Sequence, residues 1–537
     1  MSQFMCPNCG VSIGVGTNGA HSYPSLPPNS LDSNNAIDLS GQMRSQYSKT
    51  IASIETDISK LDDEMSRLQM VMDQLAAEHQ SLEKSLEQHR AVMAPIRRIP
   101  LEVLSGIFIF CADSSSSDSG SNFYVTQAPM QLTFVCNKWR RLAISMSQLW
   151  SSISLHGGDS SGRGMVYYPE RSIRTDMLST WLLRSGSSPL TLAIDALWLE
   201  HKALTSCIEI LIPHSHRWLD VTFALDEVHW EMLWDAKGHL PQLERFDADC
   251  LGEPLDGLDT NVPSDIFQIA PKLHTITMRN NLHPSDWLVP WGQLRCFNFN
   301  LHVHLGSPTV LEACSNLNRC TIDVCSLDDT LDHLDHSSLV SLHLILHVKK
   351  HLDVLFNILT FRALQDLDIV RPLAENATLA LPQNAVASML DRSSCNLQRL
   401  RLFRIGISGD ELVAILQAQP SLVELVIHEP TSPIVTKRVL KRMTHNMSHS
   451  FSTASPLVVP NLKRLELFAQ FPFGNRVILD LIQSRWRRDL TQGPRLESVK
   501  LGFTRTVSSE MIAQMAFWRK EGLNLEVQTG GRAVQWS

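Results

Sequence analysis

The sequence lacks several features that would place it in common classes of protein. It contains no stretch of about 18 consecutive apolar residues, so we expect no transmembrane helix. Its first residues, Met1–Cys6, do not combine a basic region with a following hydrophobic one, which is the pattern of a secretion signal. The 11 cysteines are odd in number and scattered among apolar residues, so we expect reduced, buried thiols in a cytoplasmic or nuclear protein.

Positive charge and chemistry-bearing motifs are also sparse. The net charge of −8 argues against a general nucleic-acid-binding protein, and no phosphate-binding loop or Gly-x-Ser-x-Gly motif occurs. Cys6 and Cys9 form half of a zinc ribbon, but the next cysteine is Cys111, so no second pair completes the site. His445 and His449 lie among polar residues typical of a solvated loop. We therefore expect no catalytic residue, no cofactor and no metal site, and a protein that is not an enzyme.

The N-terminal part of the chain divides into two segments of different composition. Residues 1–47 are rich in Ser, Asn, Gly and Pro, which predicts a disordered segment. Residues 48–94 contain neither Gly nor Pro, and a heptad pattern starts at Ile51, which predicts a long coiled-coil-like helix of about 65 Å. The heptad positions alternate at steps of three and four: Ile51, Ile54, Ile58, Leu61, Met65, Leu68, Met72, Leu75, His79, Leu82, Leu86, His89 and Met93.

Acidic residues flank the seam of this predicted helix. A parallel homodimer would place Asp57 opposite Asp62 and Glu78 opposite Glu83, and like charges at these positions oppose pairing. Packing on the chain's own body, packing on a different partner and self-pairing are all open, but we expect no stable parallel homodimer.

A helical module is predicted over residues 95–155. Its first helix should start at Ile99–Pro100, because proline is favoured at the first helical position, and Glu102 then suits the helix dipole. Val103–Cys111 carries no charge, and a second, amphipathic helix is expected over Gln131–Ile144. Two short helices leave a large apolar surface uncovered, and such a surface usually marks a partner site.

This module resembles an F-box. It contains Ile-Pro-x-Glu-Val-Leu, then Val-Cys-x-x-Trp-Arg, then Leu-Trp, in the order of that family, although the serine-rich segment Ala112–Ala128 separates the first two. The alternative is a helical hairpin packed on the following domain. The resemblance implies that a Skp-type adaptor binds Ile99, Pro100, Leu101, Glu102, Val103, Leu104, Ile107, Phe108, Val135 and Cys136, while Trp139, Leu142, Leu149 and Trp150 pack the module.

A repeated pattern fills residues 156–537. Apolar triads spaced Leu-x-x-Leu-x-Leu recur at intervals of 21 to 40 residues, with helix-like segments before several of them. Strand-plus-helix units at this period predict an α/β fold, namely an irregular leucine-rich-repeat solenoid. An ordinary α/β domain with short buried strands is the alternative. The triads begin at Trp218, Leu243, Leu273, Leu294, Leu317, Leu339, Leu364, Leu397, Leu422, Leu462 and Leu496.

Charged residues alternate with the buried positions of the later predicted strands. Residues on either side of a buried leucine point to the opposite face of a strand, so these charges should share one surface. Their mixed signs suit a protein target better than nucleic acid, although plain solvation of the sheet explains them equally well. The candidate target-binding residues are Asp366, Asp368, Arg399, Arg401, Glu424, Arg464 and Glu466.

The whole chain resembles the F-box-like proteins that are numerous in fungi. The resemblance implies a substrate receptor of a Skp–cullin–F-box ubiquitin ligase, in which the module holds the adaptor and the repeats hold an unknown protein target. A scaffold outside any ligase, which uses the repeats for protein assembly, is the alternative. An enzyme that uses the C-terminal domain is a third possibility, for which the sequence offers only unassembled histidines.

Overall fold

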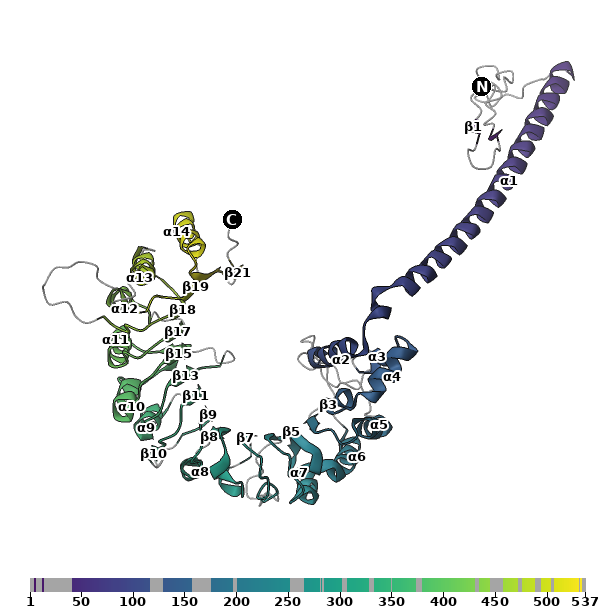
Figure 1. The fold of residues 1–537 in the computed structure, drawn as a ribbon. Helices are drawn as coiled ribbons and strands as arrows, with labels where there is room; N and C mark the ends of the chain where they lie inside the picture. Colours follow the sequence, from purple (N-terminus) through teal and green to yellow (C-terminus); the bar gives the residue numbers. More distant parts are fainter. Residues whose placement is uncertain are drawn as a thin grey trace. The chain divides into compact units, whose positions relative to one another are not determined.

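The computed structural model divides the chain into two compact units, Met1–Pro100 and Leu101–Ser537 (Figure 1). Each unit is described by itself. The structure describes residues 4–5, 12–13, 41–115, 129–156, 175–196, 200–251, 265–280, 282, 284–301, 307–327, 333–348, 350–372, 379–429, 434–444, 457–471, 476–487, 494–503, 507–530 and 532–533.

The first unit is dominated by one long helix, as the heptad pattern predicts. Helix α1 spans Gly41–Met93, about 80 Å of axis, and the 3-10 helix η1 (Pro95–Arg98) follows it. The helix begins earlier than predicted, because the residues from Gly41 to Tyr47 include good helix formers and no proline. The rest of the predicted disordered segment lies outside the described residues, apart from the antiparallel pair β1 (Phe4–Met5) and β2 (Ser12–Ile13).

The second unit starts with the helical module, which comprises α2 (Leu101–Ser115), α3 (Met130–Thr133), α4 (Asn137–Ser145) and the 3-10 helix η2 (Ser147–Trp150). The single helix expected over Gln131–Ile144 is wrong: α3 ends at Thr133, and the extended backbone of Cys136 precedes a new helix, α4. Of the predicted serine-rich insert, the first four residues continue α2, and residues 116–128 lie outside the described part of the chain.

The remainder of the second unit is built on one long sheet. Among the described residues the sheet has 15 strands: β21 is antiparallel to β20, and the other 14 are parallel, with no closed barrel. The strands are β3 (Ser152–His156), β4 (Leu190–Asp195), β5 (Trp218–Asp226), β6 (Arg245–Leu251), β7 (Thr275–Asn280), β8 (Cys296–Leu301), β9 (Arg319–Val324), β11 (Ser341–Leu346), β13 (Asp366–Val370), β15 (Arg399–Phe403), β17 (Glu424–His428), β18 (Arg464–Ala469), β19 (Ser498–Phe503), β20 (Asn524–Thr529) and β21 (Arg532–Ala533).

All eleven repeated triads coincide with parallel strands of this sheet. Ten of the triads supply one buried residue before the strand and two within it, as Leu397, Leu400 and Leu402 do for β15, whereas Trp218 of the first triad is itself the first residue of β5. The register aligns equivalent positions, so that Leu400 lies between Leu367 and Leu425. The sheet begins at Ser152, so the predicted boundary between residues 155 and 156 falls inside β3. The mixed α/β class and the long helix are therefore confirmed.

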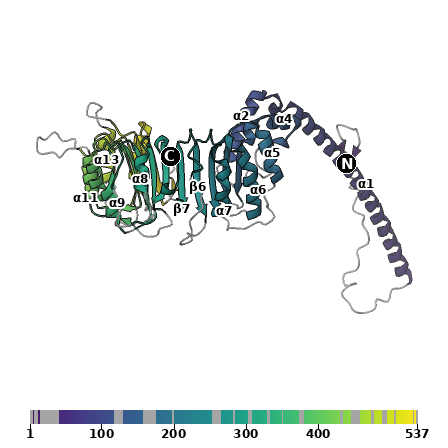
Figure 2. The ribbon, with the colours of Figure 1, turned by 90° about the horizontal axis from the view of Figure 1, so that it is seen from below.

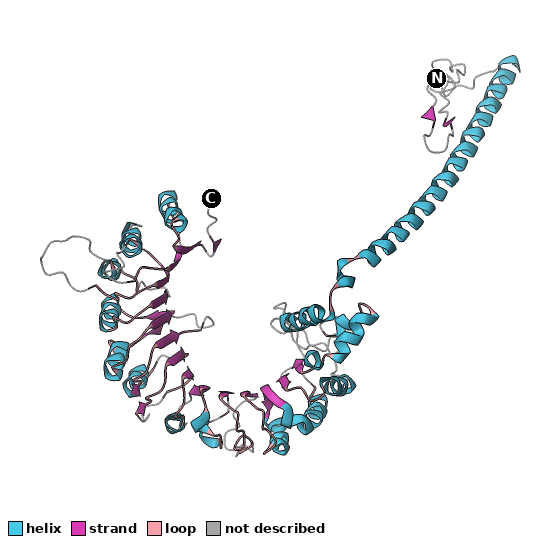
Figure 3. Ribbon diagram, viewed as in Figure 1, coloured by secondary structure: helices cyan, strands magenta, loops and turns pink. Residues whose placement is uncertain are grey.

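Helices connect the strands and lie on one side of the sheet, which curves with the strands on its inner side (Figures 1 and 3). Figure 2 shows strands such as β6 and β7 running alongside the connecting helices. The connecting helices are α5 (Thr175–Ser185), α6 (His201–Leu211), α7 (Glu227–Glu231), α8 (Ser307–Ala313), α9 (Leu352–Ile358), α10 (Ala385–Ser393), α11 (Gly409–Ala418), α12 (Lys437–Met443), α13 (Arg476–Trp486), α14 (Ser509–Lys520) and the 3-10 helices η4 (Ile212–Arg217), η5 (Met232–Ala236), η6 (Pro284–Asp286) and η7 (Trp291–Gln293).

Short strand pairs and a buried arginine join some of these connections. Strand β10 (Leu334–Asp335) pairs with β12 (Leu359–Thr360), and β14 (Leu379–Ala380) pairs with β16 (Ile405–Gly406). The buried Arg485 of α13 donates hydrogen bonds to three backbone carbonyls, at 2.8 Å to Met443 and Val459 and at 2.7 Å to Val458. One side chain therefore fixes two chain segments that neighbour it in space.

None of the helices in the described ranges has the length and apolarity that crossing a bilayer requires.

Trp150 joins the helical module to the sheet, and we predict that Trp150→Ala lowers the free energy of unfolding by about 3–5 kcal/mol. The ring is fully buried, its N–H donates to the carbonyl of Ala143 at 2.8 Å, and it packs edge-on against Trp181 at 5.3 Å. Denaturant titration of the full chain measures the loss. The matched control is Trp234→Ala, on an exposed side chain, which should change stability by less than about 0.5 kcal/mol. Equal stability of the two variants would contradict the prediction.

We predict that α1 does not make the chain dimerise. Light scattering on the full chain should therefore give the mass of a monomer, 60.3 kDa. The apolar heptad residues of α1 are exposed, and the acidic pairs described above oppose a parallel dimer. The double variant Asp57→Lys and Glu78→Lys converts both repulsions into attractions with Asp62 and Glu83, so it should raise the dimer fraction. A wild-type dimer that persists at low salt and is unchanged by this variant would show the prediction wrong.

Candidate functional site

Helix α2 carries an exposed apolar stripe, which we define as Val103, Ile107 and Phe110. These residues are spaced four and three apart, so they share one helix face, and their exposed fractions are 54%, 40% and 72%. Leu104 and Phe108, which lie about 110° around the helix axis from this stripe, are buried. Helix α2 therefore holds the module together with one face and presents a second apolar face to solvent.

An open groove adjoins the start of α2. It has a volume of about 610 Å³ and is lined by Leu101, Lys138, Arg141, Leu142 and other residues of α4. Apolar side chains form part of this lining and two cations stand beside them. The groove and the α2 stripe are two features of the same small module.

The predicted adaptor-binding residues separate into exposed and buried groups. Leu104 and Phe108 were predicted to contact the adaptor, but Leu104 is 1% exposed and Phe108 is fully buried, with its ring 4.9 Å from that of Trp139. These two residues pack the module and offer no surface to a partner. Ile99 and Pro100 precede α2 and belong to the first unit. The exposed members in the second unit are Leu101, Glu102, Val103, Ile107, Val135 and Cys136.

The residues that we predicted to pack the module lie inside it or at its edge. Leu149 and Trp150 are buried, whereas Trp139 and Leu142 are half-buried. Phe110 and Phe134 are exposed apolar residues that the predicted set does not include. The sequence indicates Phe110 through its helical spacing, because it follows Val103 and Ile107 on one helix face.

The seven predicted target-binding residues lie on one face of four neighbouring strands. They occupy the positions that alternate with buried residues, and the register places Asp366 beside Arg399 and Arg401 beside Asp368. We call this set the charge ladder: Asp366 and Asp368 of β13, Arg399 and Arg401 of β15, Glu424 of β17, and Arg464 and Glu466 of β18.

Glu424 is the centre of the charge ladder. Its carboxylate lies 2.9 Å from Arg401, 2.7 Å from Arg464 and 3.3 Å from Arg399. Burial alone would raise the pKa of Glu424, but hydrogen bonds from Arg401 and Arg464, with the charge of Arg399, outweigh it and lower this pKa. The ladder charges therefore pair with one another across strands.

A row of aromatic rings runs beside the charge ladder. Phe403, His428 and Phe468 occupy equivalent positions on β15, β17 and β18, and their ring centroids are 4.2 and 4.3 Å apart in succession. Nε2 of His428 lies 2.8 Å from the carboxylate of Glu466, which links the row to the ladder. On β19, Gly502 leaves room for the Phe468 ring, since a Cβ there would lie 2.1 Å from it.

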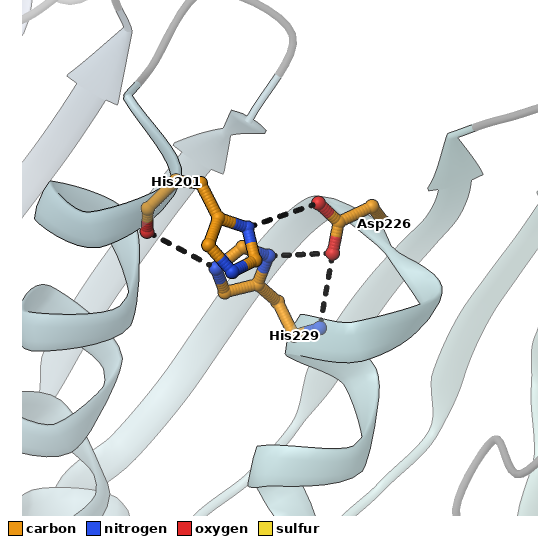
Figure 4. A group of neighbouring side chains, drawn as sticks. All are labelled: His201, Asp226 and His229. Atoms are coloured by element: carbon orange, nitrogen blue, oxygen red, sulfur yellow. Dashed lines mark hydrogen bonds and ion pairs between the residues drawn. The ribbon is translucent and has the colours of Figure 1, made fainter.

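Two histidines and an aspartate meet at the edge of the sheet near α6 and α7 (Figure 4). Asp226 ends β5 and caps α7, where its Oδ1 accepts a hydrogen bond from the backbone N–H of His229 at 3.0 Å. Nδ1 of His229 lies 2.5 Å from the same oxygen, and Nδ1 of His201 lies 3.8 Å from Oδ2. We call these three residues the histidine cluster.

Asp226 of the histidine cluster, Glu227 and Asp249 all act on the thiol of Cys250. Burial is the largest cause that raises the pKa of the Cys250 thiol to about 11, and the charges of Glu227, Asp249 and Asp226 raise it further. The thiol therefore stays neutral near pH 7, and the local charge favours a cation.

The sequence pattern did not indicate the histidine cluster, because its members come from different connections. Asp226 and His229 have the spacing of a helix cap followed by a residue in the first turn, which is a readable signal. His201 is 25 residues before Asp226, and only the stacking of successive strands brings it close. His445 and His449, the histidine pair considered from the sequence, lie outside the described residues.

We predict that the double variant Arg399→Glu and Arg401→Glu lowers the free energy of unfolding by about 1–2 kcal/mol. Each new carboxylate would face Glu424 and an aspartate of β13 in place of an ion pair. The matched control is Arg438→Glu, whose partner Asp410 lies 2.8 Å away in an exposed pair, and it should have almost no effect. Denaturant titrations that fail to separate the two variants would show that the charge ladder contributes nothing to stability.

No protein-family model matches this chain, and no curated protein sequence matches it. The geometry of the described residues and the motifs of the sequence therefore carry the functional argument.

Proposed function

We propose that this chain is a substrate receptor of a Skp–cullin–F-box ubiquitin ligase, in which the α2 stripe binds the Skp-type adaptor. The observation that carries the proposal is the exposure of Val103, Ile107 and Phe110 on the helix that bears the F-box-like motif. The module covers only one of the two apolar faces of this helix, and an uncovered apolar face usually marks a partner site. The adaptor is the partner that the resemblance implies for the remaining face.

The arrangement of the module supports the same proposal. The Trp-Arg and Leu-Trp elements of the F-box-like motif supply internal packing, through Trp139 against Phe108 and through the buried Trp150. The three residues of the α2 stripe stay exposed to solvent. The proposed adaptor surface is therefore smaller than the predicted set, because Leu104 and Phe108 lie within the module.

The proposed target-binding part is the long sheet, which we assign to an irregular leucine-rich-repeat solenoid. Its support is the coincidence of each repeated triad with one parallel strand, and the connection of successive strands through helices on one side. The face with the charge ladder and the aromatic row would hold a protein target. The chain would then act without chemistry of its own, in the cytoplasm or nucleus, by raising the effective concentration of the target near the ligase.

The test is capture of a purified Skp-type adaptor by the full chain, with affinities measured by calorimetry. We expect wild type to bind, and the double variant Ile107→Glu and Phe110→Glu to lose about 2 kcal/mol or more, roughly 30-fold in affinity, as for interface anchors. Both side chains are exposed, so the variant should remain folded. The matched control is Leu183→Glu, an exposed apolar residue of α5 outside the module, which should bind as wild type does.

Failure of the folded wild-type chain to capture the adaptor would overturn the proposed ligase function. The alternative, a scaffold outside any ligase, would then be favoured. Equal affinities for wild type and the stripe variant would show that the adaptor, if bound, uses a different surface.

A further inference from the structure

We infer that His201, Asp226 and His229 form a binding site for a divalent transition-metal ion of the zinc type. Each residue offers one ligand atom, and these atoms all lie within 4.8 Å of one another. Imidazole and carboxylate are ligands that Zn²⁺ prefers, and three protein ligands with an open fourth position are a common zinc arrangement. This inference goes beyond the proposed function and is independent of adaptor binding.

The donor atoms already converge on one point (Figure 4). Both histidines turn Nδ1 toward the Asp226 carboxylate, at 3.8 Å for His201 and 2.5 Å for His229. Donors around a tetrahedral zinc ion stand about 3.3 Å apart, given zinc–ligand bonds of about 2.0 Å. The two histidine–carboxylate separations therefore need to change by less than about 1 Å, all the donor atoms lie within 4.8 Å of one another, and the ion takes the place of the hydrogen between Nδ1 and Oδ1.

The second ring nitrogen of His229 has the partners that a metal-binding histidine needs. Nε2 lies 3.2 Å from the hydroxyl oxygen of Thr205 and 3.4 Å from the backbone carbonyl of His201. The Thr205 hydroxyl donates to that same carbonyl at 2.9 Å, so its oxygen is available to accept from the Nε2–H. Such an outer hydrogen bond fixes the ring and leaves Nδ1 to face the ion.

One of the three ligands is buried and two are exposed, which suits a metal site open to solvent. The His229 side chain is fully buried, whereas His201 is 63% and Asp226 44% exposed. The buried ligand is held in place before binding, and the exposed ones leave a path for the ion and a position for water. Glu227, which follows Asp226 directly in the chain, adds a negative charge that attracts a cation.

Helix capping alone does not explain this arrangement. A cap needs only one oxygen of Asp226, which accepts from the backbone N–H of His229. It does not account for His201, whose ring centroid lies 4.4 Å from that of His229 and whose Nδ1 faces the second oxygen. A metal ion bound by Asp226 and both histidines would account for the position of His201 as well as for that of His229.

The test is a calorimetric titration of the chelator-treated full chain with Zn²⁺, in a Cys6→Ser and Cys9→Ser background that removes the Cys-x-x-Cys pair of the sequence. We expect His201→Ala to remove one bound equivalent, or to weaken it by more than the roughly 10–100-fold typical of losing a ligand's hydrogen-bond partner. Thr205→Val should weaken the same equivalent within that range. Because His201 is exposed, His201→Ala should keep the fold, and unfolding curves check this.

The matched control is His216→Ala, an exposed histidine of η4, which should bind Zn²⁺ as the background chain does. A titration with Co²⁺ gives a second readout, because a tetrahedral Co²⁺ absorption band should appear with the background chain and vanish with His201→Ala. Equal Zn²⁺ binding by His201→Ala and the background chain, or an equal loss with His216→Ala, would overturn the inference.

Discussion

The second unit depends on the backbone hydrogen bonds between consecutive parallel strands. They fix the register, so that a buried leucine of one strand lies between the equivalent leucines of its two neighbours, as Leu400 does between Leu367 and Leu425. Apolar burial then stabilises every strand through its neighbours. The same register aligns the opposite face, where the charge ladder and the aromatic row follow. Both candidate surfaces of the sheet are therefore products of one constraint on the backbone.

Much of this architecture could be predicted from the sequence, because burial repeats with a fixed spacing. The prediction overlooked β4 and β20, where Pro189 and Gly522 stand at the first position of the triad, and β3, whose Trp150, Ile153 and Leu155 fit the pattern but were assigned to the helical module. The break between α3 and α4 was also missed, because it depends on an extended backbone at Cys136 that no proline or glycine announces.

The candidate sites were less predictable, because they depend on contacts between residues far apart in the sequence. The alternation along each strand correctly placed the charge ladder on one face, but it could not show that Glu424 binds three arginines from two other strands. Apolar spacing in α2 predicted a surface for a partner, but only packing against Trp139 shows that Phe108 belongs to the interior. The histidine cluster depends on the lengths of the connections between strands. The sequence alone does not show where those connections place their residues in space.

The contacts of Arg485 have a consequence for how the chain tolerates changes in length. Its guanidinium fixes the carbonyls of Met443, Val458 and Val459, which stand on either side of residues 445–456. With both ends of that connection held, its closure costs only about 0.6 kcal/mol more for each doubling of length. Sequences related to this one could therefore differ freely in size at this point, and an inserted reporter domain would be carried there with little strain on the sheet.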